Sequence, residues 1–179
     1  MTVVIVVLIV IATPFIILFA SALFIDRAYS LYRSVIINAP IEVVFNYLKC
    51  IKNQDNFNVW VMRDPEMKKD FNGTDGTVGF CYAWDGNKKA GKGEQEIKSI
   101  KDNERIEAEI RFEKPFKAVA HTVFDLEREG ENQTRITWSM ASRQKYPMNF
   151  MNPFMNSLLG KDLEISLENL KKILEEKKE

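Results

Sequence analysis

Two acidic residues, Glu94 and Glu96, have a spacing that would suit a catalytic pair. They stand two apart within a predicted strand, 91–101, so both side chains would project from the same face. On the wall of an apolar cavity, such carboxyl groups would have raised pKa values and could act in acid–base steps. However, the alternate positions, Gln95 and Ile97, suit the covered face better because Ile97 is apolar. We therefore expect Glu94 and Glu96 to face outward, and we assign no catalytic residue.

The other reactive side chains are few and far apart. The single histidine, His121, falls on the strand face opposite Ala120 and Thr122, so we expect it at the surface. The two cysteines, Cys50 and Cys81, cannot make a disulfide framework and are expected to be small buried side chains. These residues are not spaced as the ligands of a metal site are, and they form no Ser-His-Asp or Cys-His arrangement. We therefore predict neither a metal nor a cofactor.

Charge and glycine placement bear on two further classes of function. The 25 basic and 25 acidic residues give a net charge of zero. A nucleic-acid-binding domain normally has a basic face, and the order of charges shows none, so we expect no nucleic-acid partner. Gly73, Gly76 and Gly79 lead into a strand rather than into a helix N-terminus, which indicates turns rather than a phosphate-binding loop.

Residues 2–25 contain no ionisable side chain and are nearly all Val, Ile, Leu, Phe or Ala. A helix of this length reaches ~36 Å, enough to cross a ~30 Å hydrocarbon core, so we predict a single-pass transmembrane anchor over 1–26. The alternative is a cleaved signal peptide, because Ala20-Ser21-Ala22 resembles a cleavage site. The long apolar run without a preceding Lys or Arg argues against it. Arg27 and Arg33 after the helix favour a cytoplasmic domain.

The remainder, 32–179, is predicted to form one α+β domain. A strand is expected at 32–38, followed by a helix at 41–50 and a second short helix at 52–60. Alternation of apolar and polar residues predicts six further strands, at 67–71, 78–84, 91–101, 104–113, 117–127 and 134–142. From 153 to 178 leucines recur every three to four residues, which predicts a long amphipathic helix.

An antiparallel sheet of six to seven strands can cover one long helix only by curling around it. The predicted inner face mixes large aromatic side chains with alanines, and Val78 is expected there beside Phe80. Small residues next to large ones either interdigitate or leave a cavity, and the pattern is compatible with both. The residues expected to line such a cavity are Phe80, Tyr82, Trp84, Gln95, Ile97, Ala108, Ile110, Phe112, Ala120, Thr122, Phe124, Trp138, Met155, Leu159 and Leu163.

Several short segments between residues 32 and 172 carry a family resemblance. In order they are VIINAPIEVVFNYL, a Trp at position 60, GTVGFCYAW, GKGEQEI, TRITWSM and FMNSLLGKDLEISLENLKK. Their order and spacing resemble the SRPBCC superfamily, the START-like helix-grip proteins that include polyketide cyclase-like and dehydratase-like members and the birch-pollen allergen. The resemblance implies a deep apolar cavity for lipids, sterols, polyketides or other hydrophobic molecules, in carriers as well as in enzymes.

Three functions are compatible with these patterns. The one we predict is membrane-anchored binding of a hydrophobic small molecule or lipid in an internal cavity. An alternative is an enzyme of the polyketide cyclase or dehydratase type, whose polar groups would fold a poly-keto substrate. A further alternative is a protein-interaction module with a filled core, which the volume of the cavity would distinguish from the other two.

Overall fold

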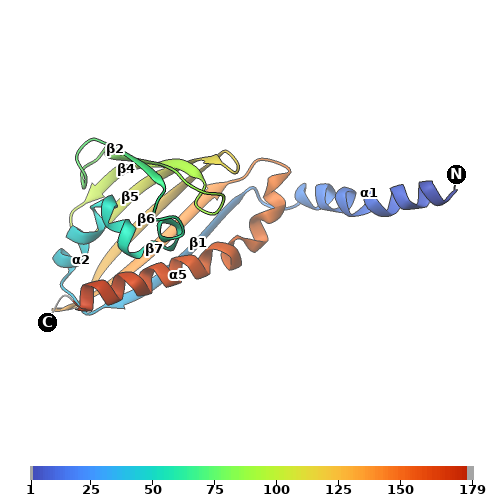
Figure 1. The fold of residues 1–179 in the computed structure, drawn as a ribbon. Coiled ribbons are helices and arrows are strands. Elements are labelled where there is room, and N and C mark those ends of the chain that lie inside the picture. Colours follow the sequence, from blue (N-terminus) through green and yellow to red (C-terminus); the bar gives the residue numbers. More distant parts are fainter. Residues whose placement is uncertain (1, 177–179) are drawn as a thin grey trace.

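Seven antiparallel strands form the framework of the computed structural model, which describes residues 2–176 (Figure 1). The strands are β1 (Ala28–Ile37), β2 (Lys68–Asn72), β3 (Cys81–Asp85), β4 (Lys92–Lys101), β5 (Arg105–Lys114), β6 (Ala118–Gly130) and β7 (Gln133–Arg143). Their order in the sheet is β1-β7-β6-β5-β4-β3-β2, so the first strand closes one edge beside the last. The predicted α+β helix-grip fold is confirmed.

Alternation along the strands separates an inner from an outer face, as a period of two requires. On β5, for example, Ile106, Ala108 and Ile110 are buried on the inner face. Arg105 and Arg111 on the same strand bind carboxylates on the outer face. The inner faces of the strands therefore supply one side of the core.

The long helix α5 (Asn152–Glu176) supplies the other side of the core and is preceded by the short 3₁₀ helix η2 (Met148–Met151). It runs across the concave face of the sheet (Figure 1). Leu163, Leu167, Leu170 and Leu174 recur on the stripe that faces the sheet, and all four are buried. The helix thus closes the curled sheet, as the spacing of the leucines predicts.

The chain between β1 and β2 forms α2 (Ile41–Leu48), the 3₁₀ turn η1 (Ile51–Asn53), α3 (Gln54–Phe57) and α4 (Val59–Met62). A single second helix over 52–60 was expected here, and the structure divides it at Asn58. That residue has an extended backbone, and its side chain accepts a hydrogen bond from the backbone N–H of Trp60 at 3.0 Å, which starts α4 in a new direction. Phe57 and Trp60 consequently both point toward Trp138.

Two strand boundaries differ from the sequence-based expectation. β1 begins at Ala28 rather than at residue 32, because Ala28 to Leu31 pair with the end of β7. β3 begins at Cys81 rather than at Val78. Gly79 has a positive φ of 87°, which ends the extended backbone, and Val78 is left 60% exposed rather than on the inner face.

The N-terminal helix α1 (Thr2–Ala22) projects from the domain at the end opposite the C-terminus (Figure 1). Its segment Val4–Ala22 has a mean hydropathy of 2.9 and is long and apolar enough to cross a membrane. A signal sequence near the N-terminus can meet the same criteria of length and hydropathy. The helix ends earlier than the apolar run, because Leu23 and Phe24 form a turn with their N–H groups bonded to Ala20 and Ser21.

Candidate functional site

A cavity of about 230 Å³ lies between the inner face of the sheet and the helices α4 and α5. Its wall is mainly apolar and draws on strands β3, β4, β5 and β7. The lining residues are Tyr29, Gln54, Asn58, Trp60, Val61, Met67, Tyr82, Trp84, Lys89, Ala90, Gly91, Gln95, Ile110, Phe112, Lys114, Pro115, Met140 and Leu159. The volume is just below the ~300–1,000 Å³ of sites for drug-sized ligands, so it suits a small ring system or a short chain.

Five aromatic side chains line the wall, those of Tyr29, Trp60, Tyr82, Trp84 and Phe112. Trp84 lies edge-on to Phe112, with ring centroids 6.1 Å apart, and next to Tyr82 at 5.7 Å. The indole N–H of Trp84 donates to the carbonyl oxygen of Ala90 at 3.1 Å, which fixes the ring at the end of β3. Gly93 on the neighbouring strand is needed for this position, because a Cβ there would come within 2.9 Å of the Trp84 ring.

Away from the mouth, where Lys89 and Lys114 lie, the polar groups of the wall are neutral. Gln95 is only 7% exposed, and its side chain forms no hydrogen bond with any residue between 2 and 176. The Gln54 amide oxygen accepts from Asn58 at 3.0 Å, but its NH₂ group finds no acceptor among these residues. Burial, and secondarily the charge of Asp55, raises the pKa of Tyr82, so its hydroxyl stays protonated and contacts only the sulfur of Met67, at 3.8 Å.

Gln54 and Gln95 are buried as residues, but their unpaired amide atoms are not fully enclosed by protein, so they reach the space of the cavity. Two amides therefore converge on one apolar cavity. The arrangement can surround an apolar body and offer amide and phenol groups to a single polar substituent.

The cavity opens at one end of the sheet. Among its lining residues, the exposed ones are Lys89, Lys114 and Pro115, and all the others are buried or half-buried. Lys89 belongs to the β3–β4 connection, and Lys114 and Pro115 belong to the turn between β5 and β6. The mouth therefore lies at the strand ends from which α1 departs.

Six of the fifteen residues predicted to line a cavity lie on its wall: Tyr82, Trp84, Gln95, Ile110, Phe112 and Leu159. The others lie elsewhere. Phe80 and Ile97 pack with Ile51 in a separate cluster, and Ala120 packs beneath Ile110 and Met140. Met155 is half-buried on α5, away from the wall.

The remaining predicted residues, Ala108, Thr122, Phe124, Trp138 and Leu163, are buried off the cavity wall. The reason is that large aromatic rings fill the half of the sheet that lies away from α1. Trp138 stacks on Phe124 at 4.7 Å and meets Phe57 edge-on at 6.3 Å. Its indole N–H donates to the Thr122 hydroxyl at 2.7 Å, so the polar atoms of that half are paired with one another.

Sequence reasoning missed the contribution of α3, α4 and the connections. Gln54 and Asn58 stand four apart and bond to each other, and Trp60 follows them directly. Two amides at helical spacing beside a tryptophan are a signal that could have indicated an inward-facing polar pair. Tyr29, Met67 and Met140 carry no comparable signal, because their place depends on how the sheet curls.

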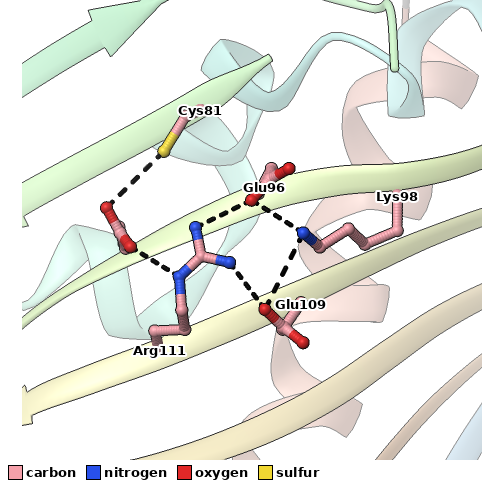
Figure 2. Close-up of polar contacts among 6 residues, drawn as sticks. Cys81, Glu96, Lys98, Glu109 and Arg111 are labelled. Atoms are coloured by element: carbon pink, nitrogen blue, oxygen red, sulfur yellow. Dashed lines mark hydrogen bonds and ion pairs between the residues drawn. The ribbon is translucent and has the colours of Figure 1, made fainter. Parts of the chain in front are cut away.

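The outer face of the same strands carries an ionic cluster (Figure 2). The Arg111 guanidinium donates to Glu94 at 2.5 Å, to Glu96 at 2.8 Å and to Glu109 at 2.6 Å. Lys98 also contacts Glu96 at 2.8 Å, and hydrogen bonds from Lys98 and Arg111 hold the pKa of Glu96 below its ordinary value.

This cluster has two consequences for the candidate acids. Glu94 and Glu96 face outward, as expected, and cannot reach a molecule in the cavity. Cys81 joins the cluster through a contact of its thiol with Glu94 at 3.8 Å, and burial together with that carboxylate raises the pKa of the thiol. Both Cys81 and Cys50 are half-buried rather than fully buried, and neither is in a disulfide.

His121 is exposed in a shallow groove of the outer face, beside Val119 and Ser142. Within the described part of the chain, no group of three or more His, Cys, Asp or Glu side chains is placed to hold a metal ion. The cavity is consequently the site whose geometry suits a ligand.

Comparisons with known proteins agree with this architecture. The fold is similar to that of norcoclaurine synthase from Thalictrum flavum in complex with dopamine and hydroxybenzaldehyde, at 13% identity, with a TM-score of 0.64 over 85% of this chain and 89% of that one. It is also similar to the Aha1 dimer protein from Colwellia psychrerythraea, at 19% identity, with a TM-score of 0.57 over 84% and 98% of the two chains. A comparison with curated protein sequences finds no match. The family model described as polyketide cyclase / dehydrase and lipid transport matches residues 29–175. The chain therefore belongs to this family, which is of the SRPBCC type.

Proposed function

We propose that this protein is a membrane-anchored binding protein for a small apolar molecule that carries one polar group. Apolar contact in the cavity would supply most of the affinity, at ~25 cal/mol per Å² of surface removed from water. The amides of Gln95 and Gln54 and the Tyr82 hydroxyl would then orient the ligand. Membership of a family whose description includes lipid transport supports a hydrophobic ligand.

The observation that carries the proposal is the Gln95 amide, buried at the back of an aromatic cavity with no partner among the described residues. Its polar atoms reach the space of the cavity, so a ligand with a complementary polar group would bond to them in place of water. The cavity also argues against an interaction module with a filled core. The cyclase-type enzyme would need an acid–base group beside the substrate. Glu94 and Glu96 lie on the opposite face, so this alternative would have to use the tyrosines of the wall or Lys89 and Lys114 at the mouth.

The membrane anchor is the second part of the proposal. Besides its length and composition, α1 is supported by its junction with the domain. Ala22 is buried there, and its carbonyl oxygen accepts a hydrogen bond from the Asn149 side chain at 2.6 Å. Cleavage after Ala22 would cut through this junction. Full-length protein should therefore stay in the membrane pellet through alkaline carbonate washing, and a mature N-terminus at Leu23 would show that α1 is a signal peptide.

Ligand binding can be tested with two adjacent leucines of α5. Leu159 lines the cavity, whereas Leu158 points to solvent and is 52% exposed. The full chain in detergent micelles is titrated with 1-naphthol, a fused ring with one hydroxyl, in an isothermal calorimeter, and the heat of micelles alone is subtracted. Wild type and Leu158→Trp should show saturable binding, whereas Leu159→Trp should lose it because the indole fills the cavity. Unchanged binding by Leu159→Trp would contradict the proposed site.

A further inference from the structure

The chain connections at the α1 end of the sheet share one side of the molecule. Antiparallel pairing places Ala28 opposite Arg143, Phe112 opposite Ala118 and Asp85 opposite Lys92. The start of β1, the end of β7, the β5–β6 turn and the β3–β4 connection are therefore side by side. α1 leaves the domain from this same end (Figure 1).

This end carries exposed positive charge that the protein itself does not neutralise. We call six residues the basic rim: Arg27, Lys88, Lys89, Lys117, Arg143 and Lys145. All six are exposed, and none forms an ion pair with another residue between 2 and 176. Free cations on one side of a molecule create a field that attracts an anionic surface.

The acidic groups nearby are fewer than the cations of the rim. Asp64 accepts a hydrogen bond from the backbone N–H of Asn87 at 2.7 Å and, like Asp26, keeps its negative charge. Asp26 accepts a hydrogen bond from the backbone N–H of Ala28 at 2.9 Å. Lys92 lies 3.0 Å from Glu113 and 3.8 Å from Asp85. At the opposite end of the sheet the pattern differs, because Lys101 pairs with Glu104 and Arg105 pairs with Asp125 at 2.6 Å. Lys171 and Lys172 near the end of α5 are also without an ion pair among the described residues, but the six cations of the basic rim gather at the α1 end, where the cavity opens.

The junction fixes how this end faces α1. The Asn149 amide donates to the carbonyl oxygens of Ala22 at 2.6 Å and Ile25 at 2.8 Å, and the Asn152 amide donates to that of Asp26 at 2.7 Å. The carbonyl of Ala22 is one that the end of α1 leaves without a helical partner, and those of Ile25 and Asp26 belong to the linker that follows. These bonds attach the end of α1 and the linker directly to η2 and the start of α5, so the basic rim lies next to the point where α1 leaves the domain.

We propose that the basic rim docks onto the anionic lipid surface of the membrane that α1 crosses, so that the mouth of the cavity lies at headgroup level. Each Lys or Arg near an anionic leaflet adds to the attraction. Phe116, 66% exposed in the β5–β6 turn beside Lys117, supplies an apolar side chain for the interface. Docking would let a ligand pass between bilayer and cavity without crossing bulk water. The inference rests on the proposed anchor but not on the cavity being occupied.

The test uses the full chain in lipid nanodiscs and measures amide hydrogen exchange in the β5–β6 turn. The backbone N–H groups of Phe116 and Lys117 form no hydrogen bond among the described residues, so their exchange reports shielding by the membrane. One set of discs contains phosphatidylcholine alone, and in the other about a third of the lipid is phosphatidylglycerol. Lys88→Glu/Lys89→Glu reverses charge within the rim. Lys171→Glu/Lys172→Glu makes the same change near the C-terminal end of α5, at the far end of the molecule.

Exchange in wild type and in the Lys171/Lys172 variant should be slower in anionic discs by on the order of tenfold, and this difference should shrink when added salt screens the charges. In the Lys88/Lys89 variant, exchange should be equally fast in the two kinds of disc. Equal exchange of wild type in the two kinds of disc, or full protection of the Lys88/Lys89 variant, would overturn the docking proposal alone. A chain that does not co-elute with the discs would instead show that the anchor, and the docking with it, is wrong.

Discussion

The two faces of β4 differ in how their polar groups are satisfied. Gln95 and Glu96 are consecutive residues, but one faces the cavity and the other faces the outer surface. Glu96 takes part in the cluster in which Arg111 binds three carboxylates, so its charge is balanced within the protein (Figure 2). The Gln95 amide is more deeply buried and has no partner among the described residues. The outer cluster is satisfied within the protein, whereas we propose that a ligand satisfies the inner face.

The inner face can enclose a cavity only if α5 covers it. Leu167 is almost fully buried against the sheet, so Leu167→Ala should lower the free energy of unfolding by ~2–5 kcal/mol. Glu168→Ala, at the next position on the solvent side, should change it by less than ~0.5 kcal/mol. Chemical denaturation of the full chain in detergent measures both. Equally small effects would mean that α5 does not cover the sheet.

The outer cluster should matter for stability but not for binding. Arg111→Met removes three charge-assisted hydrogen bonds and leaves Glu94, Glu96 and Glu109 close together. Because the guanidinium is partly exposed and screened by solvent, we expect a loss of roughly 1–2 kcal/mol of unfolding free energy. The affinity for 1-naphthol should not change. A large loss of affinity would show that the two faces are not independent.

Removing the Gln95 amide should have the opposite effect on stability to removing the Arg111 guanidinium. Gln95→Leu replaces an unpaired buried amide by an apolar side chain of similar size, so the free energy of unfolding should rise by up to about 1 kcal/mol. Denaturation without ligand measures this change. A clear destabilisation would indicate that the amide has a partner within the protein, and that its role is structural.

The smallest expected effect concerns pH and Glu96. Hydrogen bonds from Lys98 and Arg111 hold its pKa below the ordinary value of 4.5. A depressed pKa means that the ionised carboxylate stabilises the folded state fully above 4.5, and that this contribution is lost as pH falls through the lower, folded-state pKa. The difference in melting temperature between wild type and Glu96→Gln should therefore shrink as the pH is lowered below that value. A difference in melting temperature that does not change with pH would contradict the lowered pKa of Glu96.

The sequence predicts the elements better than the cavity. The alternation of Ile106, Ala108 and Ile110 marks the inner face of β5, and the leucine spacing marks α5, because these periods are local properties of strands and helices. Periodicity gives the face of a residue but not its position along a curled sheet. Ala120 and Phe112 both face inward, yet only Phe112 reaches the cavity.

Where the cavity ends is decided by contacts between distant segments. Phe57, Phe124 and Trp138 come from three different elements and together fill the half of the sheet away from α1. The amides of Gln54 and Gln95 approach the cavity from a helix and from a strand. The placement of Trp60 beside them depends on the break at Asn58, a residue that the sequence-based prediction placed inside a continuous helix.

The most direct test of the central claim compares 1-naphthol with naphthalene, which lacks the hydroxyl. If the inner face offers a free amide, wild type should bind 1-naphthol more tightly by on the order of tenfold, because the hydroxyl gains a hydrogen bond in a buried site. Gln95→Leu should bind the two compounds with equal affinity, relative to their partition into the same micelles. If Gln95→Leu keeps the wild-type preference for 1-naphthol, the Gln95 amide does not recognise the ligand, and the proposed role of the inner face is wrong.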